Sequence, residues 1–137
     1  MSVEKGRVWE ERCGYGISAY SSNFVVIENN SIDGNYSQVY GMGFDESENL
    51  TVEGNIVEKN AFDGLEIFCR AKNILIEKNK ISFNRYNGVK LVNSKGIVLR
   101  RNEITYNYRP VYPSGYWGIG IHVDESSENL IVENLIA

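Results

Sequence analysis

A repeat of about two dozen residues runs through most of this chain, and it limits the possible folds more than any other feature. Four segments share a template in which one asparagine is followed by another five residues later. The first asparagine stands at 30, 55, 79 and 102, and the second at 35, 60, 84 and 107. Successive repeats are thus 25, 24 and 23 residues long. A period of this length indicates a solenoid, in which each repeat is a unit stacked on the next.

Apolar residues keep the same phase in every repeat, and within each short run they alternate with polar ones, which is the period of a β-strand. The three apolar columns are Val25, Leu50, Ile74 and Ile97; Ile27, Val52, Ile76 and Leu99; and Ile32, Val57, Ile81 and Ile104. A glycine column, Gly16, Gly41, Gly64, Gly88 and Gly120, precedes a further run of alternating residues. Each repeat therefore contains three short strands separated by tight turns.

Strands this short, with no helix between them, pair only with their equivalents about 4.8 Å above and below. The prediction is an all-β chain: a right-handed parallel β-helix, a single-stranded solenoid of about five coils with three parallel sheets. Turn asparagines tolerate left-handed backbone angles, and here they are expected to form ladders of side-chain amides along the axis. Asn35 is expected to belong to the second interior ladder.

These columns resemble the right-handed parallel β-helix repeat family, the pectate-lyase-like solenoids, over about residues 14 to 136. That family includes polysaccharide lyases, hydrolases and C5-epimerases, together with periplasmic accessory proteins and phage or adhesin shafts. The resemblance implies a fold and leaves the activity open. It also implies an extracellular or periplasmic location. The chain differs from the enzymes of the family in having fewer coils and no helical cap.

The domain organisation follows from the repeat. Residues 1–13 are expected to form an N-terminal cap or extension, and residues 14–137 the β-helix. The template stops in mid-coil at the C-terminus, which predicts either truncation of a longer helix or end-to-end pairing between chains, hence a homo-oligomer.

Composition excludes several classes of function. The chain has 14 basic and 18 acidic residues, which does not favour nucleic acid as a partner. It lacks an apolar stretch long enough to cross a membrane, and it shows no signal peptide, so a soluble protein is expected. Cys13 and Cys69 fall in different columns and are not expected to pair, and Cys69 is interpreted as a small core residue. A single histidine excludes a zinc site.

Residues that alternate with the inward ones on the first strand of each coil face solvent. One outer column is Ser18, Gly43, Glu66, Lys90 and His122, and its neighbour is Tyr20, Asp45, Phe68, Val92 and Asp124. The candidate catalytic residues are Lys90, His122, Asp124 and Glu66. The competing interpretation is that Glu66 and Lys90 form an ordinary cross-strand ion pair and that His122 is an exposed strand residue.

One coil is longer than the rest, with 32 residues between Gly88 and Gly120. The extra residues contain both prolines and several aromatic side chains, and loops on a rigid scaffold often bind ligands. The candidate substrate-binding residues are Tyr108, Arg109, Tyr112, Tyr116 and Trp117, whose rings would stack on sugar rings.

Two functions from different classes compete. The leading hypothesis is a module that binds or processes polysaccharide. A lyase or epimerase would need a base such as His122 or Lys90 and a cation for a uronate carboxylate. A hydrolase would need two carboxylates, for which Glu66 or Asp45 with Asp124 are available. The alternative is a non-catalytic structural or interaction solenoid.

The second outer face favours that alternative. An apolar stripe is predicted at Val26, Thr51, Leu75, Val98 and Ile131, which suggests lateral packing against another chain. The neighbouring column is Glu28, Glu53, Glu77, Arg100 and Glu133. These carboxylates could attract calcium, but they are single and lie in no recognisable calcium-binding loop, so no cofactor is predicted.

Overall fold

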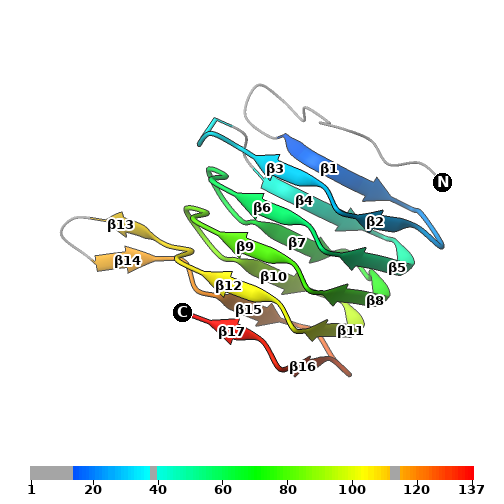
Figure 1. Ribbon diagram of the computed structural model, residues 1–137. Helices are drawn as coiled ribbons and strands as arrows, with labels where there is room; N and C mark the ends of the chain where they lie inside the picture. The colour runs from blue at the N-terminus through cyan, green and yellow to red at the C-terminus, as the bar shows by residue number, and fades with distance from the viewer. Residues whose placement is uncertain (1–13, 38–39, 112–114) are drawn as a thin grey trace.

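The structure is a computed structural model that describes residues 14–37, 40–111 and 115–137, and it is built from short strands wound into stacked coils (Figure 1). Three parallel sheets run the length of the stack, and each contains five strands, one from each successive coil. Within the described ranges there is no helix. The predicted all-β parallel β-helix is confirmed.

The three sheets take the first, second and third strand of each coil, respectively. The first sheet consists of β1 (Tyr15–Tyr20), β4 (Tyr40–Asp45), β7 (Leu65–Phe68), β10 (Val89–Val92) and β15 (Ile121–Asp124). The second sheet consists of β2 (Val26–Glu28), β5 (Glu48–Glu53), β8 (Lys72–Glu77), β11 (Lys95–Arg100) and β16 (Leu130–Val132). The third sheet consists of β3 (Ser31–Asp33), β6 (Ile56–Glu58), β9 (Lys80–Ser82), β12 (Glu103–Thr105) and β17 (Leu135–Ile136).

The predicted apolar columns fill the interior. Leu50, Ile74 and Ile97 are paired in register across neighbouring strands and are almost completely buried. On the last coil the inward residues Val123 and Ile131 are 45% and 43% exposed, respectively, because no further coil of the described chain covers them.

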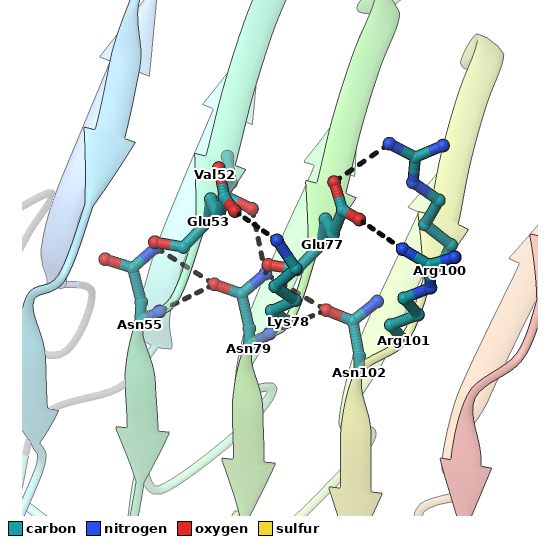
Figure 2. Close-up of polar contacts among 9 residues, drawn as sticks. All are labelled: Val52, Glu53, Asn55, Glu77, Lys78, Asn79, Arg100, Arg101 and Asn102. Carbon is teal, nitrogen blue, oxygen red and sulfur yellow. Dashed lines mark hydrogen bonds and ion pairs between the residues drawn. The ribbon is translucent and has the colours of Figure 1, made fainter.

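The first asparagine ladder is continuous from Asn30 to Asn134 (Figure 2 shows its central part). In each step the backbone N–H and the side-chain amide of one asparagine both donate to the Oδ1 atom of the next. At Asn55 these two donors lie 2.9 Å from Oδ1 of Asn79, and at Asn79 they lie 3.0 Å from Oδ1 of Asn102. The ladder therefore satisfies buried backbone groups at a turn, where no sheet bond reaches them.

The ladder asparagines do not use the left-handed angles that turn asparagines tolerate. The left-handed residue is the one before each ladder position. In the first ladder these residues are Asn29, Gly54, Lys78, Arg101 and Glu133, with φ between 55° and 67°. Asparagine is therefore required at the ladder positions for its side-chain amide, which bonds both along the axis and to nearby carbonyls.

Asn35 does not join the second ladder, contrary to the prediction. The N–H of Ser37 donates to the carbonyl of Gly34 at 2.9 Å, and both Asn35 and Tyr36 have positive φ, the pattern of a type I′ turn. Asn35 is consequently exposed. Oδ1 of Asn60, which an interior Asn35 would have bonded, is buried without a partner. The ladder consists of Asn60, Asn84 and Asn107.

Cys69 is also placed differently from the prediction. It is exposed in the turn after β7, where it has φ of 53°, and is not a core residue. The Cys69 thiol donates a hydrogen bond to Asp45. Burial of the sulfur is the main cause that raises the pKa of this thiol, and the hydrogen bond raises it further. Cys13 lies outside the described residues.

The outer face of the second sheet needs a one-residue correction on its last strand. Val98 pairs with Leu130, and Arg100 pairs with Val132. The apolar stripe therefore ends at Leu130 and not at Ile131, and Val132 replaces Glu133 in the neighbouring column. The reason is that β11 and β16 keep the same 32-residue offset as Gly88 and Gly120, because the whole insertion precedes Gly120.

The long coil forms a β-hairpin that projects from the side of the solenoid (Figure 1). It consists of β13 (Arg109–Val111) and β14 (Gly115–Trp117), which pair antiparallel. The hairpin connects the third sheet to the first, so it lies at the corner beside β15. The predicted cap at 1–13 lies outside the described residues. In the part of the chain that the structure describes, no helix has the length and apolar character to span a membrane.

Candidate functional site

The outer face of the first sheet brings the predicted catalytic column together. The strand register pairs Gly43 with Glu66, Glu66 with Lys90, and Lys90 with His122. Asp124 lies two residues beyond His122 on β15, where it is exposed and pairs in register with Val92. Three of the four predicted residues are thus immediate neighbours, and Asp124 lies at the edge of the group.

Glu66 is the centre of this group. Its Oε1 atom lies 3.4 Å from Nζ of Lys90, and its Oε2 atom accepts a hydrogen bond of 3.1 Å from the Tyr15 hydroxyl. The Glu66 side chain is only 13% exposed. Burial raises its pKa above the usual value, although the Lys90 charge and the Tyr15 hydrogen bond act in the opposite direction. Glu66 is therefore a carboxyl group that keeps its proton to a higher pH than an ordinary glutamate.

Gly43 is what allows Tyr15 to reach Glu66. The two strands are separated by β4, and a Cβ atom at Gly43 would lie 2.2 Å from Cε1 of the Tyr15 ring. The ring therefore crosses the face directly over the glycine. Burial and the adjacent Glu66 carboxylate raise the pKa of Tyr15, so the phenol stays protonated and acts as a donor.

The Tyr15→Phe substitution tests this link. It removes the hydroxyl that stabilises the Glu66 carboxylate, so we expect the pKa of Glu66 to rise further. An NMR titration of the glutamate carboxyl carbons measures the effect. Tyr106→Phe, at an exposed tyrosine remote from Glu66 in the strand order, serves as the control and should leave the titration unchanged. An unchanged or lower pKa in Tyr15→Phe would contradict the role assigned to Tyr15.

Asp63 is a second buried carboxyl group, which the sequence reasoning missed. It precedes Gly64 and is 4% exposed. Its Oδ1 atom accepts hydrogen bonds from the backbone N–H and the side-chain amide of Asn87, at 2.9 and 2.8 Å. Burial raises its pKa, while the Asn87 bonds and the nearby charges of Lys90 and His122 oppose the rise. The Asp63 charge also raises the pKa of Glu66.

The pH dependence of stability follows from the direction of the Asp63 shift. Because the folded-state pKa is raised, the contribution of this group is complete below its unfolded pKa of about 4 and is lost as the pH rises through the folded pKa. Asp63→Asn keeps the Oδ1 acceptor and removes the titration. We expect it to be more stable than the wild type near neutral pH, by on the order of 1 kcal/mol, with the gain vanishing in acid. Thermal unfolding followed by circular dichroism across this range measures it, and an equal gain at every pH would refute the explanation.

A stack of aromatic rings runs parallel to the charged column. Tyr15 and Tyr40 have ring centroids 4.9 Å apart, Tyr40 and Phe62 are 5.7 Å apart, and Phe62 and Tyr86 are 5.0 Å apart. The rings lie at the corner between the third and first sheets, on the same side as the hairpin. Because ring faces are covered by neighbouring rings, the stack presents edges and polar tips outward. Phe62 is 40% exposed.

The predicted substrate-binding residues belong to the hairpin. Tyr108 and Arg109 are both exposed where the hairpin begins. Tyr116 and Trp117 lie on β14, opposite Pro110 and Arg109 in the antiparallel register, so the backbone brings these residues together. Tyr112 lies outside the described residues. Their role in sugar binding stays a prediction.

Two glutamates of the acidic column on the second sheet, Glu53 and Glu77, are engaged in ion pairs (Figure 2). Glu77 is buried and lies 3.0 Å from an Arg100 nitrogen and 3.6 Å from an Arg101 nitrogen. The Arg100 hydrogen bond lowers the pKa of Glu77. Glu53 pairs with Lys78 at 2.9 Å. In the described ranges, no three His, Cys, Asp and Glu side chains lie together in a way that would hold a metal ion.

A hollow of about 470 Å³ lies at the corner between the first and second sheets. Its charged groups are paired with one another, because Arg70 lies 3.8 Å from Glu46 and Lys72 lies 2.9 Å from Glu48. Cys69 also lines this hollow. The basic groups there are therefore already neutralised within the chain.

A comparison with known protein families agrees with this architecture. Residues 15–137 match the family model described as the right-handed beta helix region. The chain belongs to this family, and the handedness predicted from the sequence is the one that the family defines. No curated protein and no solved structure gives a significant match.

Proposed function

We propose that this β-helix binds a linear polysaccharide that lies along the solenoid axis, over the outer face of the first sheet. The observation that carries the proposal is the parallel course of the aromatic stack and the column of Glu66, Lys90 and His122. Both place one side chain on each coil that they cross, about 4.8 Å apart, so a polymer aligned with the axis can contact successive coils. Family resemblance supports a carbohydrate ligand by analogy.

The proposal assigns separate contacts to the two rows. Edges and polar tips of the stacked rings would contact sugar hydroxyl groups, since their faces are covered. Face-on stacking would fall to the hairpin, whose aromatic residues include Tyr108, Tyr116 and Trp117. Arg109 and Tyr112 complete the hairpin contacts expected from the sequence.

Within this proposal, Glu66 is the residue we expect to transfer a proton. A buried carboxyl with a raised pKa retains a proton to donate to a glycosidic oxygen, which is the task of a general acid. Asp63 is the nearby carboxyl group that we expect to act together with Glu66. It replaces Asp45 and Asp124, which the sequence suggested as members of a hydrolase pair. Those two lie on β4 and β15, three strand steps apart, or about 14 Å. His122 and Lys90 remain the candidate bases.

A glycan array combined with lyase and hydrolase assays tests the proposal. We expect binding to at least one linear glycan, and its loss when Lys90 and His122 are both replaced by alanine. Where the array is positive, turnover that falls at least about 100-fold in Glu66→Gln would identify the general acid. No binding to any glycan would refute the proposed function. Binding without turnover would leave a carbohydrate-binding module.

The exposed apolar stripe supports a second candidate, a structural or interaction solenoid. Val26 and Leu130, at its two ends, are 47% and 54% exposed on the outer face of the second sheet. Lateral packing through this face, or end-to-end packing through the last coil, would produce a homo-oligomer. Light scattering that shows a dimer, together with full tolerance of the Lys90→Ala and His122→Ala double variant, would favour this candidate.

A further inference from the structure

We propose that the glycan on the first sheet is a neutral or amino-sugar polymer and that the face excludes polyuronates. The inference rests on the proposed function, because it concerns the ligand of that same surface. It starts from the charges that the first sheet presents. Its two outer columns carry the carboxyl groups of Asp45, Glu66 and Asp124, with Asp63 beside them, and they carry a single lysine, Lys90.

Three basic groups near this surface are committed to carboxylates of the chain itself. Lys90 is paired with Glu66, Arg70 with Glu46, and Lys72 with Glu48. A uronate polymer carries one carboxylate per sugar. Each would have to displace one of these acidic partners or remain close to unpaired negative charge, and uncompensated like charges disfavour binding.

Burial of the two central carboxyl groups strengthens the argument. Asp63 is 4% exposed and the Glu66 side chain 13% exposed, so their charges are poorly screened by water. Both already have raised pKa values, and an adjacent uronate would raise them further at a cost in binding free energy. An ammonium group on an amino sugar would have the opposite effect. A neutral sugar would bring hydroxyl groups, which donate hydrogen bonds to carboxylates without adding negative charge.

The experiment compares four linear hexasaccharides of equal length by isothermal titration calorimetry, at low ionic strength and neutral pH. They are a glucosamine oligomer, its fully N-acetylated form, a β-1,4-glucose oligomer and a galacturonate oligomer. We expect the galacturonate oligomer to bind at least about tenfold more weakly than the best of the other three, since like-charge contacts cost at least this much in a specific site.

Charge variants locate the effect. Asp45→Asn and Asp124→Asn should each raise the affinity for the galacturonate oligomer by up to about fivefold, the largest effect usual for one exposed charge pair. Glu28→Gln is the matched control, because it removes one carboxylate from an exposed position on the second sheet. It makes the same change in net charge on a different face and should leave the affinity almost unchanged.

The outcomes separate this inference from the function on which it rests. Preferential binding of the galacturonate oligomer would overturn the inference and leave polysaccharide binding intact. Equal effects of Glu28→Gln and the two aspartate variants would also overturn it, because the selection would then reflect net charge alone. If none of the four hexasaccharides binds while the array is also silent, the proposed function itself fails.

Discussion

Asn79→Ala is expected to lower the free energy of unfolding by about 3–5 kcal/mol, because it removes the centre of the first ladder. Oδ1 of Asn79 accepts both the backbone N–H and the side-chain amide of Asn55, at 2.9 Å each. Its amide donates to the carbonyl of Val52 at 2.9 Å and to Oδ1 of Asn102 at 3.0 Å (Figure 2). Alanine leaves several of these buried groups without partners, each costing about 1–3 kcal/mol. Urea denaturation measures the difference.

An exposed asparagine of the same chain provides the control. Asn23 accepts one side-chain hydrogen bond, from Asn49 at 2.9 Å, and is open to solvent, so water replaces the lost bond. Asn23→Ala should cost less than about 1 kcal/mol. If the two substitutions cost the same, the ladder would not be the source of stability at the turns, and packing of the apolar columns would have to explain the rigid stacking.

The fold was predictable because one column of residues identifies every coil. The spacing of the asparagines and of the glycines before the first strands gave the number of strands per coil and the register of the first sheet, including Glu66 opposite Lys90. One error occurred where a turn changes direction. Asn35 shares the spacing of its column, but the type I′ turn at Gly34 turns it outward, and spacing carries no information about backbone angles.

The sequence predicted the candidate site residues that lie on strands but not those that lie in turns. Alternation along a strand states which side chains face outward, so Glu66, Lys90 and His122 were placed on one face. Asp63 and two rings of the stack, Phe62 and Tyr86, lie before the first strands of their coils, where alternation does not apply. The sequence nevertheless contained an indication of this site, because the residues directly before the five glycines occupy equivalent positions in successive coils. In that column Tyr15 and Tyr40 are followed by Asp63, Asn87 and Ile119.

The second large effect concerns the glycine column, where we expect Gly88→Ala to lower the stability of the fold. A Cβ atom at Gly88 would lie 2.3 Å from Cγ2 of Ile104, 2.7 Å from the carbonyl oxygen of Gly120 and 2.8 Å from Nδ2 of Asn107. The first contact is with a core side chain, the second with the backbone of the next coil, and the third with the second ladder. None of these atoms is the far end of a flexible side chain, so relief requires the coils to move apart.

We therefore expect Gly88→Ala to cost about 3 kcal/mol or more, at the upper end of the range for overpacked cores. Gly14→Ala is the matched control, because a Cβ atom there meets nothing within 4 Å. It should leave stability unchanged within about 0.5 kcal/mol. Gly88 does not have a positive φ, so glycine is required here because a side chain would clash and not because of its backbone freedom. A small cost for Gly88→Ala would mean that neighbouring coils are free to separate at this corner, and the close stacking that aligns Glu66, Lys90 and His122 would then need another cause.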